Sequence, residues 1–130
     1  MRLLALVLAV ALTGCASVKD MIPSFQDPNQ SAKIIDVRQS VVQLDCKQPH
    51  APQVKLIKNN LEWFELYSTS KGERQKDVLR LIKPMQETVD DFYKRSTSEK
   101  QGSDTYCEIK KKIMTTQAEK AASAVLGRFL

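Results

Sequence analysis

The sequence has little of what enzyme and metal sites are built from. Its 130 residues include one histidine and four glycines, and aromatic residues make up 6% of the chain. A single imidazole does not form a common zinc site when the cysteines are engaged elsewhere. Phosphate-binding loops, nucleophile elbows and nucleic-acid-binding modules have sequence signatures, and none of them occurs here. The sequence therefore predicts a protein that is not an enzyme and that uses no metal, no cofactor and no nucleic acid.

Long hydrophobic runs are also missing. The longest, Leu3–Leu12, has ten residues, about half of the roughly 20 that a helix needs to cross a bilayer. Met1 and Arg2 precede this run and the small residues Thr13 and Gly14 follow it, which is the pattern of a secretion signal. The net charge of +5 is compatible with an anionic membrane surface and does not require a polyanionic partner. The leading segment therefore predicts export and not membrane spanning.

The end of this segment, Leu12-Thr13-Gly14-Cys15, resembles the lipobox of bacterial lipoproteins. The resemblance implies cleavage after residue 14, a diacylglyceryl group on the Cys15 sulfur and an acyl chain such as palmitate on its amino group. Two or three chains make a stable anchor, so the protein would be held on a membrane without spanning it. In enterobacterial lipoproteins an Asp after this cysteine favours the inner membrane, whereas Ala16 stands here. The resemblance thus implies the outer membrane, facing the periplasm; an ordinary signal peptide or a buried first helix is the alternative.

The next residues, 15–30, are predicted to be the lipidated cysteine and a flexible tether. They contain two prolines and several Asp and Asn residues, with no sustained helical period. Met21, Ile22 and Phe25 are the apolar exceptions, and they either dock on the folded domain or enter the lipid headgroups. The sequence therefore divides into a signal peptide at 1–14, the tether at 15–30 and a folded periplasmic domain at 31–130.

Four segments of the folded domain have the three-to-four spacing of apolar residues that is typical of an amphipathic helix. They cover about 31–46, 52–70, 73–95 and the chain from 103 onward, and Pro84 is expected to kink the third or divide it in two. The stripes are Ile34, Val37 or Arg38, Val41, Leu44 and Asp45, widened by Ile35 and Val42; Val54, Ile57, Leu61, Phe64 and Tyr67, flanked by Leu56 and Trp63; Val78, Leu81, Met85, Val89 and Phe92, with Leu79 and Ile82 beside them; and Tyr106, Ile109, Ile113, Gln117, Ala121, Val125 and Phe129. No alternating strand pattern competes, so the predicted fold is an all-α, up-down bundle of about four helices.

Cys46 and Cys107 are predicted to form a disulfide. Export takes the chain out of the reducing cytosol, where disulfides do not persist. In an up-down bundle the first helix ends where the fourth begins, so the two cysteines belong to the same end. Closing a loop of about 60 residues contributes roughly 4 kcal/mol in the chain-entropy model, a large share of a small domain's stability. Two unpaired buried thiols are the alternative.

Several charged residues and the histidine are predicted to have no chemical role. His50 is expected to be an exposed loop residue. Glu87 and Asp90-Asp91 are expected on a solvated face, with Lys94-Arg95 as ion-pair partners one helical turn later. The run Lys110–Lys112 fans over most of a helical turn, so it favours a solvated face over a single anion-binding stripe.

The largest aromatic cluster, Trp63, Phe64 and Tyr67, is the candidate contact for a partner. Adjacent helical residues diverge by about 100°, so Trp63 and Phe64 cannot both point into the core. Phe64 and one neighbour are expected in the core. Trp and Tyr are common anchors at interfaces, so one member of the cluster is expected to flank a groove where a partner binds.

Most of the mature chain resembles small uncharacterised lipoproteins encoded by tailed bacteriophages. The resemblance lies in Asp20–Phe25, Asp27–Ile34, Asp36–Arg38, Tyr106–Lys112 and Val125–Phe129. It brings no assigned activity and no functional residues. If the protein is phage-encoded, the resemblance implies a role in envelope modification, such as superinfection exclusion, or an accessory role in lysis.

A second resemblance is architectural and involves only Cys46 and Cys107. Secretin pilotins are small lipoproteins of four helices with a disulfide from the end of the first helix to the last.

Taken together, these features predict a lipid-anchored, non-enzymatic interaction or envelope-modifying domain with a protein partner in the envelope. The alternative is a pilotin-like carrier, which would need an apolar groove for a helix of an outer-membrane partner.

Overall fold

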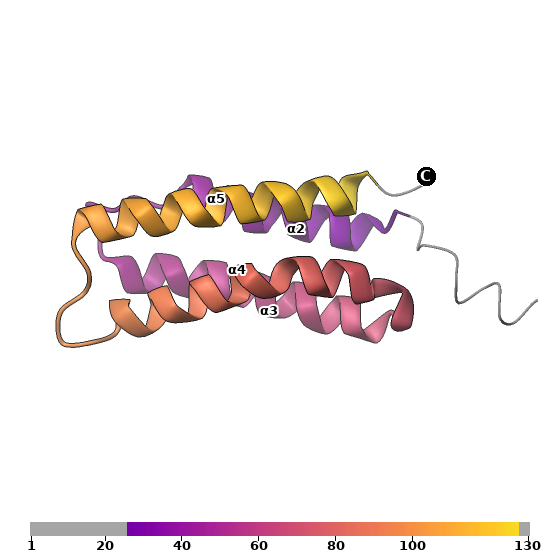
Figure 1. The fold of residues 1–130 in the computed structure, drawn as a ribbon, viewed down its shortest axis with the longest axis horizontal. Helices are drawn as coiled ribbons and strands as arrows, with labels where there is room; N and C mark the ends of the chain where they lie inside the picture. The colour runs from indigo at the N-terminus through magenta and orange to yellow at the C-terminus, as the bar shows by residue number, and fades with distance from the viewer. Residues whose placement is uncertain (1–25, 128–130) are drawn as a thin grey trace, which may run out of the picture.

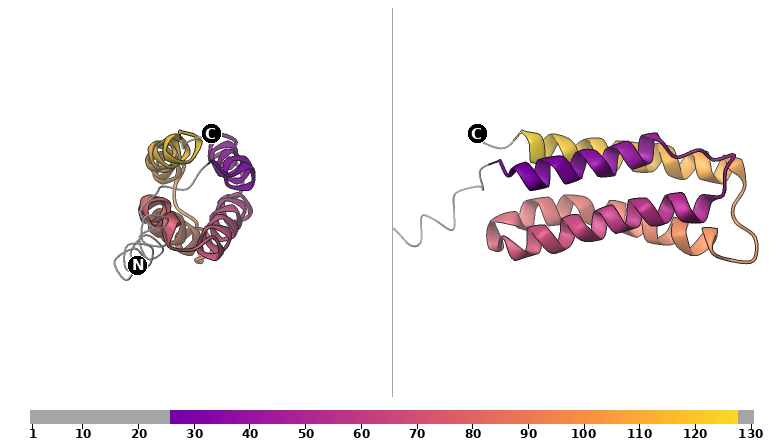
Figure 2. Two further views of the ribbon diagram at one scale, coloured as in Figure 1. Left: turned by 90° about the vertical axis from the view of Figure 1, so that its right-hand side faces the viewer. Right: turned by 180° about the vertical axis from the view of Figure 1, so that it is seen from behind.

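The computed structural model describes residues 26–127, which form an antiparallel bundle of four α-helices (Figure 1). The helices are α2 (Pro28–Val42), α3 (His50–Ser70), α4 (Lys76–Ser96) and α5 (Asp104–Leu126), and a short 3-10 helix, η1 (Glu73–Gln75), precedes α4. Both α2 and α4 pack against α3 and α5, so the helices enclose one core (Figure 2). The described residues contain no strand. The predicted all-α bundle is confirmed.

Helix α2 begins three residues before the predicted boundary. The Asp27 side chain accepts hydrogen bonds from the backbone amides of Asn29 and Gln30, at 2.9 and 3.1 Å, and so caps the helix. Pro28 occupies the first helical position, where its missing N–H costs nothing and its fixed φ angle suits a helix. Residues 28–30, predicted to belong to the tether, are therefore part of the bundle.

Local chemistry also accounts for the start of α5 and the turn after α3, whereas α2 ends at Val42, four residues before the predicted end at Cys46. The Ser103 hydroxyl accepts a hydrogen bond from the Tyr106 amide, which confirms Ser103 as the cap of α5. Gly72 has a φ angle of 93° in the turn after α3, a conformation that glycine adopts without a steric penalty. Pro84 does not divide α4, which is one continuous helix. The fully buried neighbours Ile82 and Met85 hold both sides of the proline against the core.

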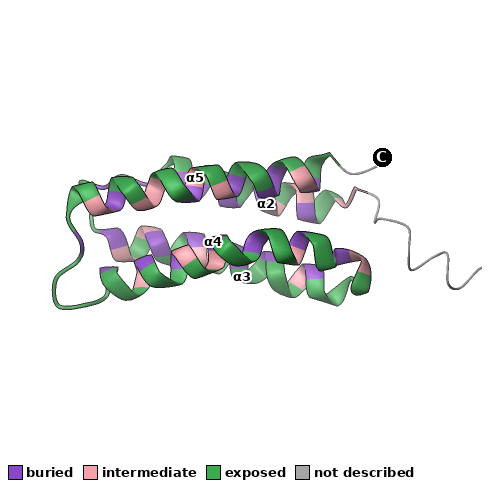
Figure 3. Ribbon diagram, in the orientation of Figure 1, coloured by how far each residue is buried: buried purple, intermediate pink, exposed green. Residues whose placement is uncertain are grey.

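The core consists of one apolar stripe from each helix, with Phe64 and Phe92 as its largest members (Figure 3). In the predicted stripes of α2 and α3, Arg38 and Asp45 are exposed, Tyr67 is half-buried and the other members are buried, while the flanking Ile35, Val42, Leu56 and Trp63 are exposed. In α4 Leu81, a member of the predicted stripe, is exposed, and its neighbour Ile82 is buried instead. The pattern of large apolar residues therefore located the buried faces of the first three helices to within one residue.

The predicted stripe of α5 is wrong in its first half. Ile109 and Ile113 point to solvent, and the buried face consists of Cys107, Met114, Ala118, Ala121, Ala122 and Val125. Phe129 lies outside the described residues. The face that enters the core is rich in alanine because α5 packs closely against its neighbours, and a search for large apolar residues selects the opposite side of the helix.

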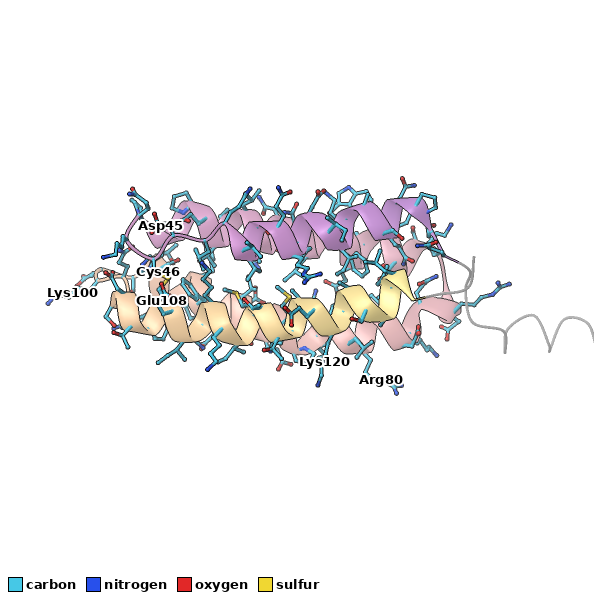
Figure 4. All side chains as sticks on the ribbon, turned by 90° about the horizontal axis from the view of Figure 1, so that it is seen from above. Asp45, Cys46, Arg80, Lys100, Glu108 and Lys120 are labelled. Atoms are coloured by element: carbon cyan, nitrogen blue, oxygen red, sulfur yellow. A yellow bond between two sulfur atoms is a disulfide. The ribbon has the colours of Figure 1, made fainter. Side chains whose placement is uncertain are left out.

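Cys46 and Cys107 form a disulfide with a Cα–Cα distance of 5.6 Å, and both residues are buried. In Figure 4 Cys46 faces the beginning of α5, close to Glu108, at the end of the bundle where α2 finishes. The predicted pairing is confirmed. We call this the disulfide end, and the end where α2 begins and α5 finishes the entry end.

The predicted signal peptide at 1–14, the lipidated Cys15 and tether residues 16–25 lie outside the described residues. Within residues 26–127, no helix is long and apolar enough to cross a membrane.

Candidate functional site

The candidate aromatic cluster splits between core and surface. Phe64 is fully buried, whereas Trp63 keeps 42% of its surface exposed and Tyr67 is half-buried. The Trp63 and Tyr67 rings lie one helical turn apart and stack almost in parallel, with centroids 5.0 Å apart. The prediction that Trp63 and Phe64 diverge is confirmed, and the surface part of the cluster is the Trp63–Tyr67 pair.

Two lysines from different elements cover this aromatic pair. The Lys33 ammonium, on α2, lies 5.0 Å from the centroid of Trp63, and the Lys71 ammonium lies 5.8 Å from the centroid of Tyr67. Both separations are within the range of cation–π attraction. The aromatic pair is therefore part of the seam between α2 and α3.

Asp27 joins the start of α2 to this pair. Its carboxylate accepts a hydrogen bond from the Tyr67 hydroxyl at 3.0 Å and pairs with the Lys71 ammonium at 3.1 Å. Asn29 donates a further hydrogen bond to the Tyr67 oxygen at 3.0 Å. The described chain thus enters the bundle directly beside the aromatic pair.

The electrostatics of Asp27 favour its charged form. Burial acts to raise the pKa of this carboxyl, but hydrogen bonds from the Gln30 amide, Lys71, Tyr67 and the Asn29 amide outweigh burial and lower the pKa below its ordinary value. The carboxylate in turn raises the pKa of Lys71. Asp27 is therefore a helix cap and an ion-pair partner at once.

Sequence reasoning missed Asp27, Lys33 and Lys71 as neighbours of the aromatic pair. A signal for Asp27 was present, because Asp followed by Pro is a typical start of a helix. The contacts of Lys33 and Lys71 depend on how α2 packs against α3, and no local pattern in the sequence contains that information.

The outward side of α3 carries further apolar residues. Leu56 is 52% exposed and Leu66 is 72% exposed, and both lie on the same outward side as Trp63. Beside them, the Lys55 ammonium lies 5.2 Å from the Tyr93 ring centroid. We call Leu56, Trp63, Leu66 and Tyr67 the outer ridge of α3.

The carboxylates of α4 pair across helices, not along their own helix as predicted. Asp90 contacts Lys58 of α3 at 2.6 Å, and Asp91 contacts Lys110 of α5 at 3.1 Å. Hydrogen bonds to Asp90 and Glu62 raise the pKa of Lys58. These residues form exposed ion pairs between neighbouring helices, so we assign them a structural role.

A shallow pocket of about 100 Å³ lies over the α3–α4 seam. Its lining is mainly charged and polar: Lys58, Glu62, Glu65, Gln86 and Asp90, with Leu61 and Val89 at its base. A pilotin-like carrier needs an apolar groove that admits a helix about 10 Å wide. This pocket does not meet that requirement.

His50 is not an exposed loop residue as predicted. It is fully buried as the first residue of α3, and its ring packs edge-on against Phe92 with a centroid distance of 5.8 Å. Its Nε2 lies 2.8 Å from the carbonyl oxygen of Cys46, and its backbone amide donates to Gln101. Among residues 26–127 no cluster of three or more metal-ligating side chains includes it. His50 therefore connects the two loops of the disulfide end.

The three consecutive lysines of α5 diverge, as predicted. Lys110 pairs with Asp91, Lys111 donates to the backbone carbonyl of Leu44 at 2.7 Å, and Lys112 is exposed. Lys111 thus satisfies a carbonyl group just after the end of α2. The run does not form a single anion-binding stripe.

Comparisons with known proteins identify no relative. No family model, no curated protein and no solved structure matches this chain.

Proposed function

We propose that this protein is a lipid-anchored envelope lipoprotein whose helical bundle is a non-enzymatic interaction domain. Cys15 carries the lipid, and the bundle faces the periplasm from the outer membrane. The leading segment supplies the export signal, and the lipobox resemblance supplies the site of lipidation. The outer ridge of α3 is the candidate contact surface.

The observation that carries this proposal is the buried Cys46–Cys107 disulfide. Disulfides persist in the periplasm and are rare in the cytosol, so the bond agrees with a signal that directs the chain out of the cytosol. The order of the chain agrees as well. Only eleven residues, 16–26, separate Cys15 from Asp27, where the ordered bundle is capped. The bundle is therefore held near the surface to which Cys15 is attached.

The pilotin-like alternative is less well supported. It has in its favour the disulfide between the loop after α2 and the first turn of α5. It also requires an apolar groove, and the pocket over the α3–α4 seam is small and lined by charged side chains. A surface contact through an exposed ridge suits the described residues better than a helix-binding groove.

The anchor is tested by changing Cys15→Ser in a Gram-negative host. We expect the wild-type protein to fractionate with the outer membrane and to carry acyl chains detectable by mass spectrometry. The variant should be soluble or unprocessed, because it lacks the sulfur that receives the diacylglyceryl group. A Cys15→Ser protein that stays in the outer membrane at the mature size would contradict the proposal.

A second variant tests the sorting step separately. Ala16→Asp leaves Cys15 in place and introduces the residue that favours inner-membrane retention. We expect this protein to keep its acyl chains and to move to the inner membrane. An unchanged outer-membrane location would argue against sorting by this signal. The mass of the variant would still show whether it carries acyl chains.

A further inference from the structure

Helix α3 is apolar on two opposite sides. Its inward side supplies Val54, Ile57, Leu61 and Phe64 to the core. Its outward side carries the outer ridge, in which Leu56 and Trp63 are seven residues apart and Leu66 follows three residues later. At about 100° per residue, Leu56 and Trp63 lie within about 20° of each other and Leu66 within about 60° of Trp63, so the three side chains share the outward side of the helix. The core accounts for the inward side only. Trp63 and Tyr67 also join the α2–α3 seam through Lys33 and Asp27, whereas Leu56 and Leu66 face solvent.

The outer ridge lies close to the point where the chain enters the bundle. Leu66 and Trp63 are four and seven residues from Ser70, the last residue of α3, or about 6 and 10 Å along the helix axis. Tyr67, in the same ridge, is hydrogen-bonded to Asp27. The segment that leads back to Cys15 therefore starts beside the ridge.

The length of that segment limits how far the ridge can lie from the anchor. Eleven residues span at most about 40 Å when fully extended, and roughly 18 Å as a flexible coil. Both lengths are comparable to the size of the bundle itself, since α3 is about 32 Å long. A surface that holds Cys15 is thus within reach of Leu66 and Trp63.

We propose that the outer ridge of α3 docks on the lipid bilayer that holds Cys15. The proposal rests on the lipid anchor proposed above. Trp and Tyr favour the boundary between headgroups and acyl chains, where one side of the ring is apolar and the other is wet. Leu66 enters the acyl boundary, and Lys33 and Lys71, which lie over the Trp63 and Tyr67 rings, border the ridge at the headgroups.

The tether makes a modest contact sufficient. A ridge of a few side chains binds a membrane weakly from free solution. Once Cys15 is anchored, docking becomes intramolecular, with an effective concentration in the millimolar range for a short flexible linker. Three nearby lysines have acidic partners, because Lys33 pairs with Asp36, Lys71 with Asp27 and Lys58 with Glu62. Docking is therefore driven by the apolar ridge, and we expect salt to weaken it little.

Trp63 is the only tryptophan of the chain, so its fluorescence reports on the ridge alone. The lipidated protein is extracted and reconstituted in phosphatidylethanolamine–phosphatidylglycerol vesicles, with and without brominated acyl chains. We expect the brominated lipid to quench Trp63, and the quenching to persist in high salt. Flotation of the same vesicles measures whether the protein is anchored.

Matched variants separate the ridge from apolar exposure in general. Leu66→Ser should reduce the ratio of docked to undocked protein roughly tenfold, since the docked state loses the burial of one leucine side chain. Ile109→Ser, on α5 near the disulfide end, removes a side chain that is 56% exposed and should leave the quenching unchanged. Equal effects of the two substitutions would overturn the proposal.

The outcomes distinguish the docking from the anchor. Protein that floats with the vesicles and shows no quenching by brominated lipid overturns the docking and leaves the anchor intact. If Trp63 is then also shielded from aqueous acrylamide, residues 21–25 or another protein cover the ridge instead. Protein that does not float overturns both proposals.

Discussion

The two ends of the bundle are held together by different chemistry. At the disulfide end, a covalent bond joins the loop after α2 to the first turns of α5, and the buried His50 ties that loop to α3. At the entry end, the contacts are hydrogen bonds and an ion pair. Gln30 is fully buried there and donates to Ser68 and Gln75, both at 2.9 Å, while Asp27 binds Tyr67 and Lys71.

This difference has a consequence for local stability. Hydrogen bonds of the entry end can be exchanged for bonds to water, so that end opens at a lower free-energy cost than the crosslinked end. The covalent bond constrains the chain even when it is unfolded. The entry end, which is nearest the proposed anchor, thus opens more easily, and the disulfide end maintains the fold.

The largest effect is expected from removing the crosslink. Changing both Cys46→Ala and Cys107→Ala should lower the free energy of unfolding by about 4 kcal/mol, because the unfolded chain regains the entropy of a loop of about 60 residues. Urea unfolding followed by circular dichroism measures the change. Wild-type protein reduced with dithiothreitol is the control and should show a similar loss. A loss smaller than that of the entry-end variant Gln30→Ala would contradict the expectation that the disulfide end contributes more.

A smaller effect is expected from Gln30 at the entry end. Gln30→Ala removes two buried hydrogen bonds and leaves a cavity, which should lower the free energy of unfolding by about 2–3 kcal/mol. Gln30→Met preserves the volume and removes Gln30 Oε1, a buried atom without a hydrogen-bond partner. We expect Gln30→Met to cost only about 1 kcal/mol in the same urea measurement. Equal losses for both variants would show that the hydrogen bonds, and not packing, hold this end.

The smallest effect is expected from Asp27. Asp27→Ala removes the cap of α2 and should cost about 1 kcal/mol. Asp27→Asn keeps an oxygen that accepts the amide hydrogen bonds and removes only the charge, so it should cost less. Asp36→Asn, in the exposed pair with Lys33, is the control for a surface charge.

Asp27 also predicts a dependence on pH. Its pKa is lower in the folded protein than in the unfolded chain, so its contribution is fully present above the unfolded value of about 3.9 and is lost as the pH falls through the folded value. Wild-type and Asp27→Asn proteins should therefore differ near neutral pH and converge in strong acid. Urea unfolding at several pH values measures this. A difference that persists in strong acid would mean that the charge of Asp27 is not its source.

The helices and the disulfide were predictable because both depend on local pattern and chain order. Phe64 on α3 and Val89 on α4 each belong to a stripe with the spacing of a buried helix face. Cys46, in the loop after α2, and Cys107, in the first turn of α5, lie at the end that an up-down bundle brings together. The start of α2 was also predictable in principle, since Asp27-Pro28 is a helix-start signature. The composition of residues 15–30 led to the tether boundary being placed three residues too late.

Other features depend on tertiary packing and were beyond local pattern. His50 lies in a proline-flanked stretch, which suggests a loop, yet Phe92 and the Cys46 carbonyl provide a buried place for its ring. In α5, alanines enter the core and Ile109 does not, because closeness between helix axes selects small side chains. The contacts of Trp63 with Lys33 likewise exist only once α2 lies against α3.

The disulfide also determines which part of the chain bears mechanical load. A pull on the two ends of the chain passes along α2, crosses the Cys46–Cys107 bond and continues along α5. Residues 47–106, which include α3 and α4, lie inside the crosslinked loop and are outside this path. Under tension, lengthening within residues 26–127 comes from unravelling α2 and α5, and α3 and α4, with the outer ridge, are extended only after the bond is reduced.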